Sequence, residues 1–157
     1  MSTYLNFEVI SIDDVPHAST YPPALPRHKR VVLVVDDERV IADTLSVILT
    51  RSGFAVATAY DGETAIELAA SVNPDLLLSD VMMGPGMDGT QLAMQVVDAF
   101  PSCKVLLFSG HAATVDLLAK ARQMGHHFTL MTKPVHPSDL LQRITESFMP
   151  VAGLYAN

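Results

Sequence analysis

The stretch VVLVVDDE, from Val31 to Glu38, decides the fold class of this chain. Its five leading apolar residues suit a strand that is buried on both faces, as the strands of parallel sheets are. The run ends in two adjacent aspartates, Asp36 and Asp37, whose like charges repel each other. A carboxylate pair at the carboxyl end of a buried strand therefore predicts a site that needs a cation. Glu38 is expected to begin the next helix, where a negative charge favours the amino end.

Apolar runs alternate with helical patterns along the rest of the chain. Further strands are expected at four places, namely Phe54–Ala59, Asp75–Asp80, Lys104–Ser109 and Phe128–Met131. After each strand the apolar residues recur at helical spacing, near 40–49, 63–72, 91–100, 115–121 and 137–148. Five such alternations predict an α/β fold, with a parallel sheet covered by helices on both faces.

The chain divides into three parts by composition. Residues 1–29 form an N-terminal extension or arm, because they show little helical periodicity and contain four prolines, Pro16, Pro22, Pro23 and Pro26. The segment Tyr4–Ile12 within it is apolar enough to pack on the sheet edge or a helix, to mediate a homodimer, or to lie loose, and these alternatives stay open. Residues 30–149 form the globular domain, and residues 150–157 form a short tail with no output domain.

Composition narrows the classes of function. Of the 157 residues, 49% are apolar and 17% are charged, which is typical of a globular protein. The net charge of −7 argues against nucleic acid and anionic membranes as partners, since both need a basic surface. A single cysteine, Cys103, allows no internal disulfide and favours a reducing compartment. With neither a secretory signal nor an apolar run of membrane-spanning length, we expect a soluble, cytoplasmic protein.

Polar residues close the expected strands one after another. Asp36 and Asp37 end the first strand, Asp80 ends the third, Ser109 ends the fourth, and Lys133 follows the fifth. In open α/β sheets the ligand site lies beyond the carboxyl ends of the strands, so these groups should converge. Carboxylate oxygens suit Mg²⁺, which uses a few carboxylates and keeps several waters. An aspartate nucleophile, a cation and a lysine together predict phosphoryl transfer. Taken singly, Asp80 would more simply be a turn residue or a helix cap.

Four motifs in this order resemble the receiver domain of two-component response regulators. They are VVLVVDDE, PDLLLSDVMM followed by MDG, LLFSG and TKPV, and the match extends from about Arg30 to Phe148. The resemblance is to the single-domain, CheY-like kind. It implies a flavodoxin-like, doubly wound sheet of five parallel strands in the order 2-1-3-4-5.

The resemblance also implies a role for each residue at the cation. Asp80 matches the phosphoacceptor, which takes a phosphoryl group from a phosphohistidine of a histidine kinase or histidine phosphotransfer protein. Asp36 and Asp37 match the acids that hold Mg²⁺, with Asp37 the more direct ligand and Asp36 acting through water. Met82 matches the position whose backbone carbonyl binds the metal.

Two further residues match positions that contact the phosphoryl group. Lys133 matches the lysine that binds it, and the bond to Pro134 is commonly cis in the family. Ser109 matches the hydroxyl that turns toward the phosphoryl oxygens when the aspartate is modified. A phosphoacceptor of this kind is a signalling protein and not an enzyme acting on other substrates. Its contacts with an unnamed downstream protein would involve the fourth helix, the fifth strand and the fifth helix.

The chain departs from the family pattern at two places in this domain. The loop after Asp80 carries one extra residue near Gly84, which predicts a reshaped or more mobile loop. Leu130 stands where the family usually has an aromatic switch residue, and Phe128 lies two residues earlier on the same face of the expected strand. Either Phe128 or Leu130 is therefore the candidate for the second switch position beside Ser109.

Three alternatives compete with the receiver interpretation. A scaffold that never takes up phosphate is favoured by the altered loop and the missing aromatic residue. A Mg²⁺-dependent phosphatase would need a second acid where Met82 stands, and a flavin module would place its phosphate beside an acidic loop.

The histidines and methionines receive simpler interpretations. His126 and His127 are expected to be surface residues rather than metal ligands, and His111 to lie near enough to Ser109 to influence a hydrolytic water. The eight methionines are expected to fill the core and loops.

Overall fold

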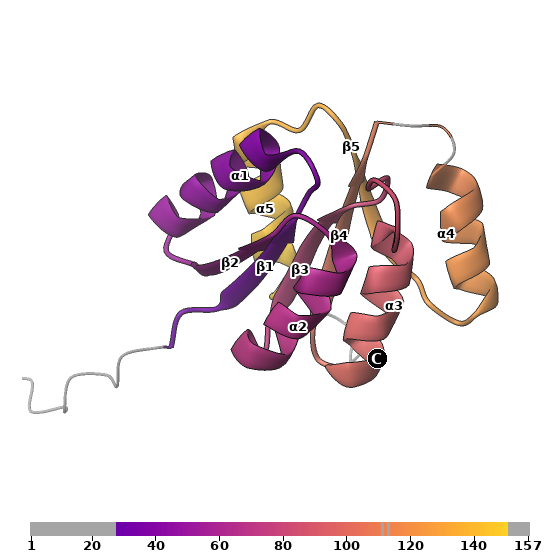
Figure 1. Cartoon of the computed structure of the whole chain (residues 1–157). Helices are drawn as coiled ribbons and strands as arrows, with labels where there is room; N and C mark the ends of the chain where they lie inside the picture. The colour runs from indigo at the N-terminus through magenta and orange to yellow at the C-terminus, as the bar shows by residue number, and fades with distance from the viewer. Residues whose placement is uncertain (1–27, 111, 113, 151–157) are drawn as a thin grey trace, which may run out of the picture.

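The computed structural model of the chain describes residues 28–110, 112 and 114–150, and these form a five-stranded parallel sheet flanked by five helices (Figure 1). The strands lie in the order β2-β1-β3-β4-β5. Their bounds are β1 Val31–Val35, β2 Ala55–Ala59, β3 Leu76–Asp80, β4 Lys104–Ser109 and β5 Thr129–Thr132. The helices that follow them are α1 Arg39–Arg51, α2 Gly62–Val72, α3 Gly89–Ala99, α4 Thr114–Gln123 and α5 Pro137–Ser147. The expected α/β class and the strand order 2-1-3-4-5 are confirmed.

Each face of the sheet carries its own apolar core. On one face, Leu33, Leu77 and Leu107 pack against α2, α3 and α4. On the other, Val34 and Leu78 pack against α1 and α5. Figure 1 shows α1 and α5 together on one side of the sheet and the other helices across it. This two-sided burial is the reason that β1 is apolar throughout and that β3 begins with the apolar run Leu76–Leu78, without alternation between apolar and polar residues.

Several element boundaries differ from the sequence prediction by one or two residues: β2 and β3 each begin one residue later, at Ala55 and Leu76, and α3 and β5 also differ. Helix α3 begins at Gly89, two residues before the expected start at Gln91, because Asp88 forms a capping box with Gln91. Strand β5 covers Thr129–Thr132 and not Phe128–Met131. Phe128 precedes it, packs against the core on the α4 side, and stacks on the ring of His126 with the centroids 5.8 Å apart.

The proposed arm and tail fall mostly outside the described part of the chain. Residues 1–27 and 151–157 belong to those two segments, and the predictions for them are not tested here. Among the residues that are described, no helix has both the length and the apolar character needed to cross a bilayer.

Candidate functional site

The carboxyl ends of four strands bring polar side chains to one edge of the sheet. Asp80 is the last residue of β3 and pairs in register with Phe108, next to Ser109 at the end of β4. Asp36 follows the last residue of β1, and Lys133 follows the last residue of β5. Parallel strands end at the same edge, so four chain segments separated in sequence meet there.

Three carboxylates form the centre of the site. Asp36, Asp37 and Asp80 each offer an oxygen atom within 4.8 Å of the other two. Asp36 is 1% exposed and Asp80 is 5% exposed, whereas Asp37 lies at the surface. Two of the three acids are therefore held in a position where an uncompensated charge is costly.

Lys133 joins the two buried acids. Its Nζ atom lies 3.2 Å from Asp36 Oδ2 and 3.2 Å from Asp80 Oδ2. Partial burial of Lys133 disfavours its charge, but the two carboxylates outweigh that effect and raise the pKa of the ammonium. The Lys133–Pro134 peptide bond is cis. Lys133 thus places a positive charge within reach of both buried carboxylates.

The ionised form of Asp80 is disfavoured despite this ion pair. Burial raises the pKa of its carboxyl group, and the nearby charge of Asp36 adds to the rise. Lys133 and the backbone N–H of Met82 act in the opposite direction without cancelling it. One ammonium is shared between two buried carboxylates, with Asp37 close by, so the cluster carries excess negative charge.

This donor set fits a hard divalent cation. All three side chains offer carboxylate oxygens, the ligands that Mg²⁺ takes in proteins, and a cation would offset the excess charge. Asp36 already uses both oxygens: Oδ1 accepts the N–H of Glu38 at 2.9 Å, and Oδ2 faces Lys133. Asp37 is the more open ligand, with Oδ2 accepting the N–H of Gly84 at 3.0 Å. Met82 follows Asp80 by two residues, in the loop after β3.

Ser109 is buried at the end of β4, and its hydroxyl group pairs with that of Thr114 at the start of α4. Thr114 is 1% exposed and was not identified from the sequence. The one sequence signal for Thr114 was a hydroxyl residue just before an apolar helical pattern. That signal is equally typical of an ordinary helix start. The pair links the predicted switch residue to α4.

The two candidates for the aromatic switch position lie in different surroundings. Leu130 is in β5 and is 36% exposed at the surface. Phe128 lies before the strand and is partly buried against the same apolar core as Leu117 and Leu118 of α4. His126 is 3.8 Å from Asp98, near the other end of α4 from Thr114, and His127 is exposed. His111 lies outside the described residues.

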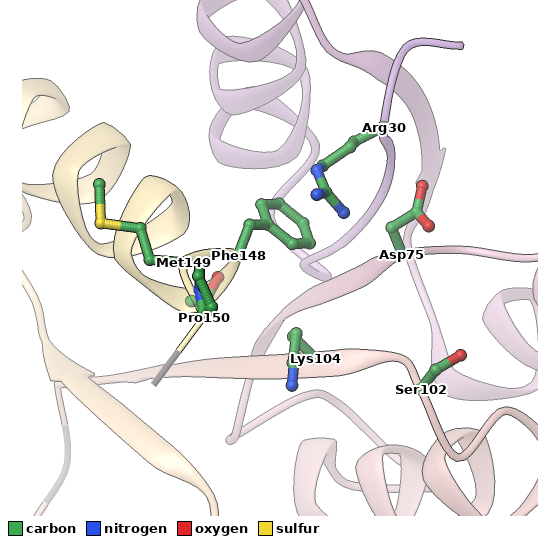
Figure 2. A pocket seen from close by; sticks show the side chains of 8 residues that line it. Arg30, Asp75, Ser102, Lys104, Phe148, Met149 and Pro150 are labelled. Atoms are coloured by element: carbon green, nitrogen blue, oxygen red, sulfur yellow. The ribbon is translucent and has the colours of Figure 1, made fainter. Parts of the chain in front are cut away.

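A separate pocket lies at the amino ends of the strands, opposite the acidic site. Figure 2 shows its lining, in which the guanidinium of Arg30 stands over the ring of Phe148 at 4.2 Å. Asp75, which accepts the N–H of Val31 at 2.7 Å, and Lys104 also line it. These residues flank the starts of β1, β3 and β4, so this pocket is remote from Asp80.

Comparison with known proteins agrees with this geometry. The family model described as "Response regulator receiver domain" matches residues 32–145. A CheY-like receiver domain protein from Methanospirillum hungatei JF-1 is 28% identical, with a TM-score of 0.69 over 75% of this chain and 92% of that one. The chemotaxis protein CheY4 of Vibrio cholerae is 26% identical, with a TM-score of 0.67 over 76% and 98% of the two chains. The signal receiver domain of an HD domain-containing protein from Pseudomonas fluorescens Pf-5 is 28% identical, with a TM-score of 0.70 over 79% and 90%.

Proposed function

Because this chain belongs to the response regulator receiver domain family, we propose that Asp80 accepts a phosphoryl group from a phosphohistidine, with Mg²⁺ bound by Asp36, Asp37 and Asp80. The donor would be a histidine kinase or a histidine phosphotransfer protein. The observation that carries the proposal is the contact of Lys133 with both Asp80 and Asp36, beside a third carboxylate. That arrangement leaves Asp80 positioned next to a fixed positive charge and next to ligands for a cation.

The chemistry follows from the groups present. A carboxylate oxygen of Asp80 attacks phosphorus, a P–O bond forms, and the P–N bond of phosphohistidine breaks, with its electron pair remaining on the imidazole nitrogen. Lys133 neutralises charge on the phosphoryl oxygens. Mg²⁺, when bound, would neutralise further oxygens of the same group, and the carbonyl of Met82 would complete its ligands on the protein side. Ionised Asp80 is required, so the burial that raises its pKa, together with the nearby charge of Asp36, must be compensated before transfer.

The surface beside Lys133 supports a protein as the donor. An apolar groove of about 400 Å³ borders this residue, lined by Ile41 and Leu45 of α1 and by Phe108, Pro134 and Val135. Lys133 both contacts Asp80 and lines this groove, so the groove is available to a protein that presents a phosphohistidine to Asp80. A helix that carries the histidine could bury its apolar side chains there, whereas a small phosphodonor would leave the groove exposed.

Phosphorylation would act on the other side of the site. The added charge near Ser109 would compete with Thr114 for the serine hydroxyl, which links the modification to the start of α4. The resulting shift in conformation would be read by a downstream protein at α4, β5 and α5, where Leu130 is exposed. In this proposal the protein transfers phosphate only to and from itself and turns over no other substrate.

The test is phosphorylation with a small phosphodonor. Wild-type protein incubated with acetyl phosphate and Mg²⁺ should gain the mass of one phosphoryl group, and Asp80→Asn should not. Asp116→Asn, which removes an exposed carboxylate of α4 by the same chemical change, should behave as wild type. No mass gain in the wild-type protein, with Mg²⁺ and donor in excess, would contradict the proposal.

A scaffold that binds its partner without phosphate is the second candidate. The observation in its favour is Leu130, a non-aromatic and partly exposed residue at the usual aromatic switch position. The discriminating measurement is partner affinity before and after phosphorylation. Equal affinities would support the scaffold, and a change of more than about tenfold would support the switch.

A further inference from the structure

The loop that joins β3 to α3, residues 81–88, contains the extra residue near Gly84. In the middle of the loop, the N–H of Gly84 donates to Asp37 Oδ2 at 3.0 Å. At the end of the loop, Asp88 caps α3 and accepts the N–H groups of Thr90 and Gln91. The loop therefore touches a proposed metal ligand directly, and its conformation bears on how that ligand is held.

Glu63, in the first turn of α2, fixes the part of this loop that leads into α3. Its Oε1 atom accepts the N–H of Met87 at 3.2 Å. The same carboxylate lies against Gly86, where an added Cβ would be 3.0 Å from Oε1. Gly86 has a φ of +112°, a conformation that other residues rarely adopt. The loop thus turns sharply at Gly86 around the carboxylate of Glu63.

Packing supports this contact. The side chain of Met87 lies against Gly62 at the start of α2, and the loop closes over a pocket of about 250 Å³. Asp37, Glu63, Gly84 and Met87 all line that pocket. Asp37 and Glu63 hold opposite ends of one short segment, so release of the segment at Glu63 would also loosen it at Gly84.

We propose that Glu63 is a positioning residue of the metal site. This inference rests on the proposed function, which supplies that metal site. By holding Met87 and Gly86, it fixes the loop so that the N–H of Gly84 orients the Asp37 carboxylate toward the cation. A ligand that is already oriented loses less conformational freedom on binding the metal. Glu63 does not itself reach the cation in this proposal and acts only through the loop.

Three variants distinguish the effect of the Glu63–Met87 hydrogen bond from the effect of the Glu63 charge. Glu63→Ala removes both the acceptor and the charge. Glu63→Gln removes the charge but keeps an Oε1 acceptor for the Met87 N–H. Glu67→Ala removes an equal charge from an exposed position one turn along the same helix. Within the described part of the chain, Glu67 makes no hydrogen bond or ion pair with the loop. Circular dichroism and thermal unfolding would establish that each variant is folded.

The first measurement is amide hydrogen exchange in the metal-free protein. In Glu63→Ala, the amides of Met87 and Gly84 should exchange about two- to tenfold faster than in wild type, the range that one net hydrogen bond provides. Glu63→Gln and Glu67→Ala should match wild type at both amides. Unchanged exchange at Gly84 in Glu63→Ala would overturn the proposal, because the loop would not transmit the loss to Asp37.

The second measurement is Mg²⁺ affinity by calorimetry. Glu63→Ala should bind Mg²⁺ about three- to tenfold more weakly, while the other two variants stay near wild type. Equal weakening in Glu63→Gln would show a charge effect and overturn the positioning role. A wild-type protein that binds no Mg²⁺ would instead overturn the metal site of the proposed function, and exchange at Gly84 would still decide whether Glu63 positions Asp37.

Discussion

The ammonium of Lys133 lies 3.2 Å from Asp80 Oδ2, yet the pKa of Asp80 is raised and not lowered. An isolated ion pair would lower the pKa of the carboxyl group. Here burial, aided by the charge of Asp36, outweighs the attraction, since Lys133 is shared between two buried acids. The metal-free site is therefore strained electrostatically in the place where the proposed chemistry needs a negative charge.

Removing the charge of Asp80 should stabilise the metal-free protein. We expect Asp80→Asn to raise the free energy of unfolding at pH 7 by on the order of 1 kcal/mol, because an unfavourable buried charge is lost. Chemical denaturation in the presence of EDTA would measure this difference. Asp116→Asn, at the surface of α4, should change stability little. A clearly less stable Asp80→Asn protein would show that the ion pair with Lys133 outweighs burial.

The same strain should appear as a dependence of stability on pH. The folded-state pKa of Asp80 is raised above its unfolded value, so the native protein takes up a proton first as pH falls. The advantage of Asp80→Asn over wild type should therefore be largest near pH 7 and shrink as pH falls through the folded pKa. Denaturation of both proteins at several pH values would check the trend, and a gap that widens with acid would contradict it.

Mg²⁺ should stabilise the wild-type protein through Asp37. At a free concentration ten times the dissociation constant, the expected gain in unfolding free energy is about 1.4 kcal/mol. Asp37→Asn should lose most of this gain, because it removes the most open carboxylate of the cluster. Thermal unfolding with Mg²⁺ or EDTA would measure it, with Asp116→Asn as the variant that keeps the full shift. A full shift in Asp37→Asn would exclude that residue as a direct ligand.

Gly89 should tolerate no side chain. A Cβ at this position would collide with the carbonyl oxygen of Asp80 and would lie 2.8 Å from Val81 Cα, both backbone atoms. We expect Gly89→Ala to cost more than about 2 kcal/mol of stability, since β3 or α3 must move. Gly84→Ala is the matched control, because a Cβ there would meet Asp37 Oδ2 only at 3.6 Å. The denaturant midpoints of the two variants would be compared. Midpoints that agree within experimental error would contradict this expectation.

Cys103 should react slowly in the native protein. Burial raises the pKa of its thiol to about 11, and the residue is 5% exposed. At pH 8 we expect its reaction with a disulfide reagent to be roughly a hundredfold or more slower than that of a free thiol, because so little thiolate is present. The reaction should accelerate with rising pH and on unfolding in urea, which is the internal control. Fast reaction at pH 8 without denaturant would indicate that the end of α3 opens easily.

Local sequence pattern was sufficient to predict the strands and helices and the convergence of five polar residues, Asp36, Asp37, Asp80, Ser109 and Lys133. The apolar runs of β1, β3 and β4 mark strands buried on both faces, and such strands belong to a parallel sheet. Asp36, Asp37 and Asp80 follow or close two of these strands, so convergence at one edge could be expected from chain order alone. The order of the strands was predicted from family motifs and not from periodicity. The start of α3 was placed late, because a capping box joins side chain and backbone in a way that apolar spacing does not record.

Only the tertiary structure decided which of these groups contact one another. Lys133 contacts acids 97 and 53 residues away in the chain, and Asp37 meets a backbone N–H 47 residues away. The pairing of Ser109 with Thr114 and of Glu63 with Met87 depends on the side-chain rotamers and on where α4 and α2 pack. Such contacts depend on angles and distances that are set when the helices close on the sheet. Burial then determines the electrostatics, and an aspartate that would have an ordinary pKa in water has a raised pKa at the end of β3.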